Sequence, residues 1–236
     1  MNQPAPPLLL GISSMATARL LEELSALYHQ ATGLAVRFQS AGGVDVAKRV
    51  AAGEAFDLVV LDAERIDQMI QTGRVLADGR VNVANSCAAA AVRAGQHRPD
   101  ISSRAALIKA LLAARSIGYS TGPSGLELLK RFDQWGIADA VRARLVQAAP
   151  GVPVGSLIAS GKAELGFQQL GELMPVAGIE ILGTLPTDAE IVSTFSAAMC
   201  TVSRHHHAVQ DFLAFLVSPV TSEAKLRYGM APVPSH

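Results

Sequence analysis

Short apolar runs alternate with amphipathic helical patterns along the first half of the chain, which is typical of βαβ units and a parallel sheet. The run at 56–61 is apolar at nearly every position, as a strand covered on both faces requires. The strands expected here cover 8–12, 34–38 and 56–61, and the helices cover 17–30 and 44–52. These units predict one Rossmann-like α/β lobe.

The same pattern restarts after residue 100 and predicts a second Rossmann-like lobe. Its expected helices cover 105–112, 126–135 and 153–159, and its expected strands cover 116–120, 144–148, 163–168 and 179–182. Two extended segments, 81–93 and 190–203, bracket this lobe and are interpreted as a two-segment hinge. Amphipathic helices expected at 208–216 and 222–228 then have to return to the first lobe.

The expected architecture is therefore α/β, with two lobes joined by a hinge that the chain crosses twice. The first lobe is discontinuous and is expected to comprise residues 1–84 and 195–236. The second lobe, residues 85–194, is inserted between the two crossings.

Charged residues make up only 17% of the chain, with 20 basic and 20 acidic side chains. Such a balance gives no field that would attract nucleic acid or anionic lipid, so neither is expected as a partner. The longest apolar run, around 88–92, is far shorter than the roughly 20 residues of a membrane-spanning helix. The first seven residues lack the features of a secretory signal, which predicts either a cytoplasmic protein or a leader that has been removed.

Cysteine and histidine do not predict a disulfide or a metal site. Cys87 and Cys200 lie in separate apolar runs, so both are interpreted as small buried hydrophobes. The three consecutive histidines at 205–207 would point in different directions at the start of a helix. No cofactor is expected.

Small, hydroxyl-rich segments follow three of the expected strands and lead into helices. In parallel sheets, ligands bind beyond the carboxyl ends of the strands, where helix N-termini offer free N–H groups. The candidate residues are Ser13 and Ser14 after the first strand, Ser40 and Gly43 after the second, and Thr121, Ser124 and Gly125 in the other lobe. None of these segments contains Arg or Lys, which suits an anion held by hydroxyl and amide donors. Ordinary helix N-caps are the alternative interpretation.

The order of elements and these segments resemble the type II periplasmic binding proteins of ABC importers, most closely the molybdate-binding branch. Ser14 and Ser40 correspond to hydroxyl ligands of that branch. The stretch 47–62 matches its helix and third strand, and 81–90 matches its outgoing hinge. The resemblance implies a monomer that closes by hinge bending around a small anion. It also implies a periplasmic location and a membrane subunit of an importer as partner.

One segment departs from the molybdate pattern. Where that branch has a ligand tyrosine after a strand, this chain reads Gly166, Phe167, Gln168 and Gln169. Amide side chains on longer stems favour a larger anion, such as an organic carboxylate. With Val152, Gln168 and Gln169 are expected to form the far wall of the site.

Two further functions remain open beside solute binding. Aconitate isomerases use a similar scaffold, and their proton transfer would need a base within reach of the substrate carbon. Asp62, at the end of the third strand, is the candidate base, and its alternative role is N-cap of the following helix. The other alternative is a cytoplasmic anion sensor. Binding is favoured over catalysis.

Lys130 is expected to face solvent.

Overall fold

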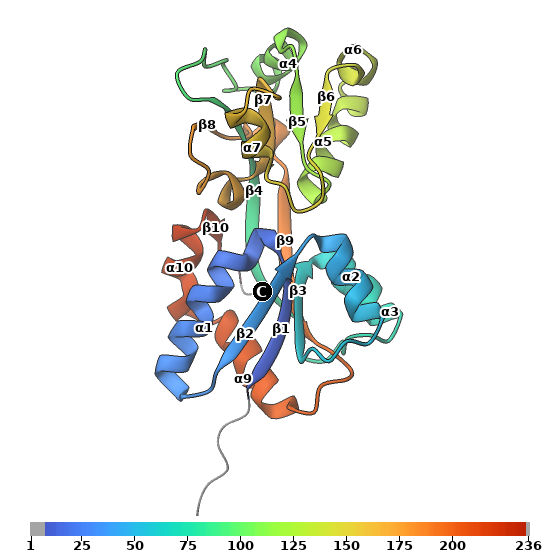
Figure 1. Cartoon of the computed structure of the whole chain (residues 1–236), viewed down its shortest axis with the longest axis vertical. Helices are drawn as coiled ribbons and strands as arrows, with labels where there is room; N and C mark the ends of the chain where they lie inside the picture. The colour runs from blue at the N-terminus through green and yellow to red at the C-terminus, as the bar shows by residue number, and fades with distance from the viewer. Residues whose placement is uncertain (1–7, 235–236) are drawn as a thin grey trace, which may run out of the picture. The chain divides into compact units, whose positions relative to one another are not determined.

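The computed structural model describes residues 8–234; residues 1–7, on which the leader interpretation rests, and residues 235–236 lie outside the described part. The chain divides into two compact units. Unit 1 contains the residues up to Asn85 and those from Thr194 onward, and unit 2 contains Ser86–Ser193 (Figure 1). Among the described residues, no helix combines the length and the apolar character needed to cross a membrane.

Unit 1 is built on a sheet with the strand order β2-β1-β3-β9-β4. β1 pairs in parallel with both β2 and β3, whereas β9 runs antiparallel to β3. The strands of this sheet are β1 (Leu9–Ser14), β2 (Val36–Ala41), β3 (Leu58–Asp62), β4 (Val81–Arg93) and β9 (Val192–Met199), and the short β10 (Met230–Ala231) pairs with β4.

Helices cover both faces of the unit 1 sheet (Figure 1). Leu58 and Val60 of β3 pack in the cluster formed with α1 and α9, and Val59 and Leu61 pack in the cluster formed with α2 and α3. The apolar run of β3 is thus explained by burial on two faces, as its sequence predicts. The helices are α1 (Ala18–Thr32), α2 (Gly43–Ala51), α3 (Ala63–Gln71), α9 (His206–Leu216) and α10 (Ser222–Arg227), with short 3-10 turns at Met15–Thr17 and Pro219–Thr221.

Unit 2 has a second sheet in which β4 is followed by β7, β5 and β6, and β8 pairs with the free side of β4. β5 is parallel to β6 and β7, whereas β4 is antiparallel to β7 and β8. The strands are β5 (Ile117–Tyr119), β6 (Leu145–Gln147), β7 (Leu165–Gln169) and β8 (Ile179–Thr184). The helices are α4 (Arg104–Ala113), α5 (Pro123–Gln134), α6 (Ala138–Arg142), α7 (Val154–Ala159) and α8 (Leu170–Leu173), with a 3-10 turn at Thr187–Ala189.

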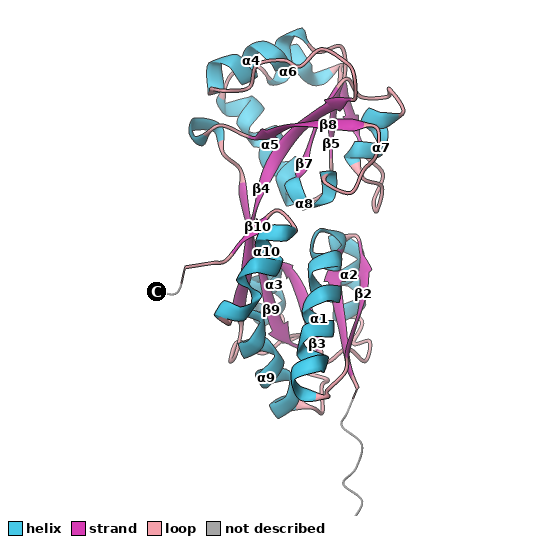
Figure 2. Cartoon of the chain, turned by 90° about the vertical axis from the view of Figure 1, so that its left-hand side faces the viewer, coloured by secondary structure: helices cyan, strands magenta, loops and turns pink. Residues whose placement is uncertain are grey.

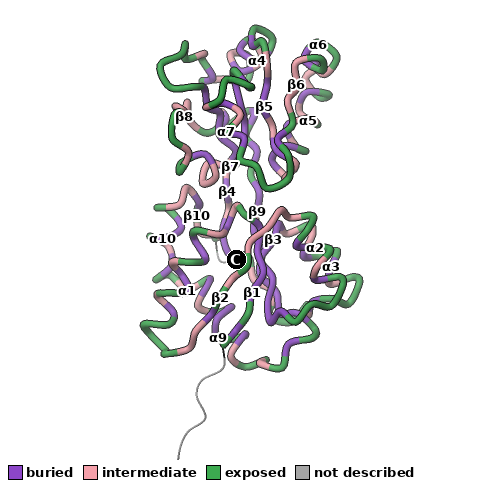
Figure 3. Tube along the Cα trace, in the orientation of Figure 1, coloured by how far each residue is buried: buried purple, intermediate pink, exposed green. Residues whose placement is uncertain are grey.

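The two faces of the unit 2 sheet have separate apolar cores. Ala88 and Ala90 of β4 pack with α4, α5 and α6, whereas Ala89 and Ala91 pack with α7 and α8 (Figure 2). The alanine run of β4 is therefore a central strand of small residues that lets helices approach from both sides. Figure 3 shows the same pattern as buried strands inside more exposed helices.

β4 and β9 each have one end in unit 1 and the other in unit 2. Within unit 1 they are tied by side chains, because Thr194 Oγ1 donates to Asn85 Oδ1 at 2.8 Å and Ser196 Oγ donates to Asn82 Oδ1 at 2.7 Å. The chain thus passes from one unit to the other through two strands.

Several element boundaries differ from the sequence expectation. Ser13, Ser14 and Ser40 belong to β1 and β2 rather than to the turns after them, because parallel pairing continues to Ser14 and Ala41. α5 begins at Pro123 rather than near Leu126, since proline is favoured at the first helical position, and so Ser124 and Gly125 lie in its first turn. Two helices, α6 and α8, were not predicted, because they are too short to show a helical period.

Both cysteines are free. Cys200 is buried as expected, but the expectation of a buried Cys87 was wrong. Cys87 is half-buried because its thiol faces Glu190, to which Sγ donates at 3.6 Å.

Candidate functional site

The carboxyl ends of β1 and β2 bring two serines together in unit 1. The register pairs Ser13 with Ser40, and their Oγ atoms lie 2.9 Å apart. Ser13 is fully buried, and its single hydroxyl hydrogen can be donated either to Ser40 Oγ or to the Ser14 carbonyl oxygen, which lies 3.3 Å away. When Ser13 donates to Ser40, the hydroxyl hydrogen of the half-buried Ser40 is free for another acceptor. Ser13 therefore orients Ser40, and Ser40 is the residue of the pair that can reach a ligand.

Ser14 ends β1 beside this pair. Its Oγ is buried and has no hydrogen-bond partner among the described residues. An unsatisfied buried hydroxyl costs about 1–3 kcal/mol, so a ligand oxygen that accepts from Ser14 would recover that energy. Thr17 donates to the Ser14 carbonyl at 3.2 Å and fixes the backbone of this turn.

The N-cap alternative does not account for the candidate hydroxyls. Ser14 precedes the Met15–Thr17 turn without a side-chain cap bond. Glycines occupy the N-cap positions of α2 and α5, Gly42 and Gly122, so neither Ser40 nor Thr121 caps a helix. The first-turn N–H groups of α2 lack intrahelical partners and remain available to an anion. In α5, Pro123 has no N–H and the Gly125 N–H donates to the Gly122 carbonyl at 3.1 Å, which leaves the N–H of Ser124.

An arginine that the sequence analysis missed lies at the same edge of unit 1. Asp62 is the N-cap of α3, where it accepts from the Arg65 N–H at 3.2 Å, and its other oxygen pairs with the Arg65 guanidinium at 2.6 Å. A Cβ at Gly43 would lie 3.3 Å from that guanidinium, so glycine leaves room for Arg65 beside the start of α2. The Asp-x-x-Arg spacing at the beginning of a helix could have indicated this pair.

In unit 2, the segment after β5 forms a tight turn into α5. Ser120 Oγ accepts from the Gly122 N–H at 3.3 Å. A Cβ at Gly125 would lie 1.9 Å from the Ser120 carbonyl oxygen, so only glycine fits there. Ser124 is 3% exposed and Thr121 is half-buried. The turn thus holds two hydroxyl residues at the N-terminus of a 12-residue helix.

The end of β7 lies at the same edge of the unit 2 sheet, because β5 and β7 are parallel and pair Tyr119 with Phe167. Gln168 and Gln169, which follow Phe167, are both buried. Gln168 Oε1 accepts from the Val154 N–H at 2.7 Å, so this side chain holds the start of α7 in place.

Gln169 has an amide that is only partly used. Its Nε2 donates to Ser193 Oγ at 2.7 Å, whereas Oε1 is buried without a partner in the described part of the chain. A half turn of the amide would let Oε1 accept from the Ser193 hydroxyl and turn the N–H₂ toward a ligand. Of the two glutamines, Gln169 therefore has the freer hydrogen-bonding group.

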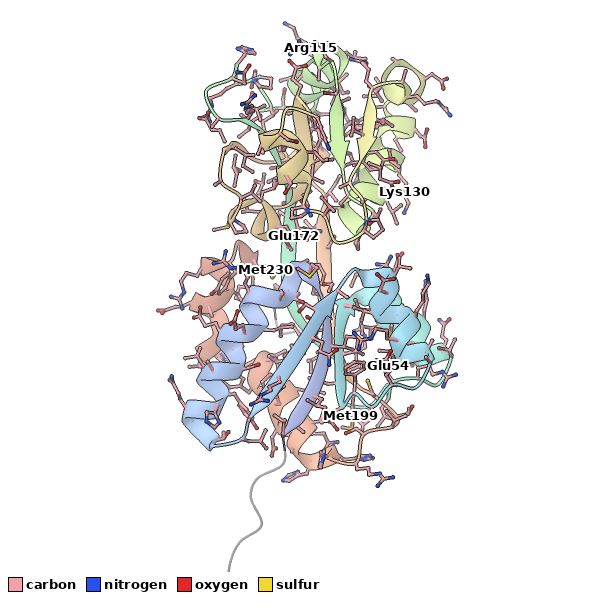
Figure 4. All side chains as sticks on the ribbon, in the orientation of Figure 1. Glu54, Arg115, Lys130, Glu172, Met199 and Met230 are labelled. Atoms are coloured by element: carbon pink, nitrogen blue, oxygen red, sulfur yellow. The ribbon has the colours of Figure 1, made fainter. Side chains whose placement is uncertain are left out.

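Glu172 lies one turn beyond these glutamines, in α8, and was not identified from the sequence. Figure 4 shows it at the end of unit 2 from which β4 and β9 leave. Burial raises the pKa of its carboxyl to about 7, and a hydrogen bond from the Gln168 side chain opposes this rise. No sequence motif marks this residue, because Gln168 lies in β7 and only Glu172 lies in α8.

The structure thus gathers the candidates at the carboxyl ends of two parallel sets of strands, one in each unit. Val152 is 41% exposed on the loop before α7 and contributes no polar side chain. Lys130 faces solvent, as expected, with 65% of its side chain exposed. His206 contacts the Ser203 carbonyl, and His207 lies near Asp211, so neighbouring histidines face different groups.

Comparisons with known proteins identify the scaffold. The model of a family described as bacterial extracellular solute-binding protein matches residues 9–231. A protein named aconitate isomerase from a Pseudomonas species is 33% identical over 230 residues, which cover 95% of this chain and 87% of that protein.

Solved structures show the same fold at lower identity. The periplasmic molybdate-binding protein of Azotobacter vinelandii has a TM-score of 0.79 and 21% identity, with 96% of this chain and 100% of that chain covered. The sulfate-binding protein SubI of Mycobacterium tuberculosis has a TM-score of 0.77 and 18% identity, with coverage of 96% and 87%. The substrate-binding domain of a putative molybdenum ABC transporter from Clostridium difficile has a TM-score of 0.76 and 14% identity, with coverage of 96% and 99%. The predicted α/β fold of the type II binding proteins is thereby confirmed.

Proposed function

The chain belongs to the family of bacterial extracellular solute-binding proteins, and from that premise we propose that it binds a small organic carboxylate with donors from both units. The observation that carries the proposal is the buried, unpartnered Ser14 hydroxyl beside Ser40 at the carboxyl end of the parallel strands. It is a donor held in place for an acceptor that, in the described part of the chain, the protein itself does not supply.

The charge at the unit 1 edge suits an anion that is bound mainly by neutral donors. Asp62 already neutralises Arg65, so this pair adds no net charge. Ser14, Ser40 and the first-turn N–H groups of α2 would donate to one carboxylate group of the ligand. Arg65 would orient a second oxygen while it stays paired with Asp62.

The unit 2 donors favour a ligand larger than a tetrahedral oxyanion. Thr121, Ser124 and the start of α5 form one group, and the amide of Gln169 forms another at the end of β7. A ligand with two or three carboxylates could use both groups at once. The 33% identity to aconitate isomerase supports a tricarboxylate over molybdate or sulfate, because the oxyanion-binding structures are only 21% and 18% identical.

A ligand that contacts both units would stabilise their closed arrangement, because it would make more contacts in the closed than in the open state. Hinge bending at β4 and β9 is part of this proposal. In the transport role, the loaded protein would act outside the cytoplasm and deliver the anion to the membrane subunit of an ABC importer. The similarity to the Clostridium difficile domain, which is named as part of an ABC transporter, supports that role.

Isomerisation of the bound carboxylate is the second candidate function, and the similarity to aconitate isomerase is the observation that favours it. The two functions share one site and differ in whether a base reaches the ligand. The structure gives Asp62 two partners, the α3 N-terminus and Arg65, and so weakens the case for Asp62 as that base.

A thermal-shift panel tests the ligand class. At about one hundred times its dissociation constant, a ligand adds roughly 2.7 kcal/mol to the free energy of unfolding. We expect cis- or trans-aconitate to raise the midpoint and molybdate, tungstate and sulfate to leave it unchanged. A rise with an oxyanion and none with any carboxylate would instead assign a tetrahedral ligand to the site.

A further inference from the structure

Glu172 differs from the other acidic residues near the candidate site. Asp62 pairs with Arg65, and Glu127 pairs with Lys130 and Arg131. Glu190 accepts from the Cys87 thiol. Among the described residues, no basic side chain forms an ion pair with Glu172, although it is half-buried.

The position of Glu172 follows from the strand that precedes it. β7 ends at Gln169, and α8 begins at once with Leu170, which directs the chain along the carboxyl edge of the sheet. Leu173 of α8 is fully buried in the core that α7 shares, so the short helix has a fixed place. Glu172 is thereby held at the edge that also carries the Thr121–Ser124 turn.

The Gln168 side chain is held in place beside the Glu172 carboxyl. The Val154 N–H binds Gln168 Oε1 at 2.7 Å, which directs the Gln168 amide nitrogen away from α7. Held in this way, the Gln168 side chain lies close enough to Glu172 to lower the pKa of its carboxyl, against the larger effect of burial. Since no basic side chain of the described residues pairs with the Glu172 carboxylate, its oxygens keep lone pairs that can accept a proton.

We propose that Glu172 is the base that moves a proton along the carbon skeleton of an unsaturated carboxylate bound at this site. The inference rests on the carboxylate function proposed above. It replaces Asp62, which is engaged at the N-terminus of α3, by an acid that has no cationic partner among the described residues.

The step is a 1,3-proton shift that needs no oxidant, reductant or cofactor. The Glu172 carboxylate takes a proton from the methylene carbon between a carboxylate and the carbon–carbon double bond. The C–H electron pair forms a new double bond, and the pair of the old double bond moves onto the conjugated carboxylate. Glu172 then returns the proton to the former vinylic carbon, so the double bond has moved and no atoms are gained or lost.

The surroundings fit this step. A base works best when its pKa is near the operating pH, and the Glu172 carboxyl, with a pKa of about 7, meets this condition. The negative charge that develops on the substrate carboxylate would be stabilised by the Ser124 N–H in the first turn of α5.

The test follows aconitate in D₂O by proton NMR. The wild-type protein is expected to interconvert trans- and cis-aconitate and to introduce deuterium at the methylene carbon. Glu172→Gln keeps the shape of the side chain but cannot take a proton, so both rates should fall by at least about 100-fold. Its affinity for trans-aconitate, measured by calorimetry, should stay within about threefold, and Glu172→Asp should recover part of the exchange.

Glu164→Gln is the matched control. Glu164 precedes β7 at its other end and accepts from the Arg115 backbone N–H at 2.7 Å. Its replacement should leave isomerisation and exchange unchanged.

Each of the other outcomes would overturn one specific claim. Turnover by Glu172→Gln within threefold of the wild type would overturn the role of Glu172 while the isomerase function stands. Binding of aconitate by the wild type without turnover or deuterium exchange would overturn this inference and leave carboxylate binding intact. Loss of affinity in parallel with turnover would assign Glu172 to binding or folding rather than to proton transfer. A wild type that binds no carboxylate would overturn the proposed function itself.

Discussion

The Oγ atoms of Ser13 and Ser40 lie 2.9 Å apart because parallel pairing of β1 and β2 places the two residues in register. Twenty-seven positions of sequence, including α1, separate them. Each of these serines lies one residue before the carboxyl end of its strand, where hydroxyl groups and free N–H groups of helices converge. The adjoining Ser14 hydroxyl, which lacks a partner among the described residues, makes this edge the part of unit 1 best suited to an anion.

Ser14→Ala should weaken ligand binding without weakening the fold. Loss of a donor to a charged ligand costs about 1.5–3 kcal/mol, roughly ten- to a hundredfold in affinity. The free protein should be as stable or slightly more stable, because the variant removes a buried hydroxyl that has no partner in the described part of the chain. Urea unfolding without ligand and calorimetry with trans-aconitate measure the two effects. A stability loss above about 1 kcal/mol would mean that Ser14 has a partner within the folded protein.

Gly125→Ala should disrupt the turn into α5. The new Cβ would lie 1.9 Å from the Ser120 carbonyl oxygen, so the backbone has to move. Overpacking of this kind costs about 1–3 kcal/mol and sometimes more, and it should displace Thr121 and Ser124. Gly122→Ala is the control, because its Cβ would have the Ser120 hydroxyl at 3.5 Å as nearest neighbour. Equal stability of the two variants in urea unfolding would contradict the close approach at Gly125.

Substitutions at the Asp62–Arg65 pair should change ligand affinity in opposite directions. Asp62→Asn keeps an N-cap for α3 but removes the charge that neutralises Arg65, so anion affinity should rise by a few-fold. Arg65→Met leaves the Asp62 carboxylate without its cation, so affinity should fall by about tenfold or more. Calorimetric titration with trans-aconitate at low and high salt measures both. If Asp62→Asn abolished isomerisation while affinity rose, Asp62 rather than Glu172 would be the base.

Glu172 should make the free energy of unfolding depend on pH. Its pKa is raised from 4.5 to about 7 by burial, so between these values the folded protein binds more protons than the unfolded chain. The contribution of Glu172 to stability is therefore present in full below pH 4.5 and lost as pH rises through about 7. Glu172→Gln should consequently gain stability relative to the wild type between these limits. Urea unfolding at pH 5 and pH 8 measures this, and a constant difference would show that the carboxyl is not destabilised by burial.

Periodicity predicted the elements of the fold best where they are long and buried. The apolar run of β3 predicted burial on both faces, and every position of β3 is buried. The helix expected at 17–30 is α1, in which Leu20, Leu21 and Leu24 are buried. Short elements were missed, since α8 has four residues and shows no period. Pro123 could have indicated the true start of α5.

The candidate site was harder to predict for a physical reason. Hydroxyls after strands were visible in the sequence, but proximity depends on strand register, which pairs Ser13 with Ser40. Arg65 was missed because its guanidinium lies beside Gly43 only when the side chain folds back to pair with Asp62, and the sequence does not show this conformation. Glu172 was missed because its environment depends on burial and on the Gln168 side chain, neither of which has a sequence motif.

Calorimetric titration of trans-aconitate into Ser14→Ala, Ser124→Ala and Lys130→Ala tests the central claim most directly. Ser14 and Ser124 belong to different units, so a ligand held by donors of both units should lose about ten- to a hundredfold in affinity with either substitution. Lys130 is exposed and pairs with Glu127 at 3.3 Å, so its replacement should change affinity by no more than about twofold. A large loss at Lys130 with none at Ser14 or Ser124 would contradict binding by hydroxyl donors of both units.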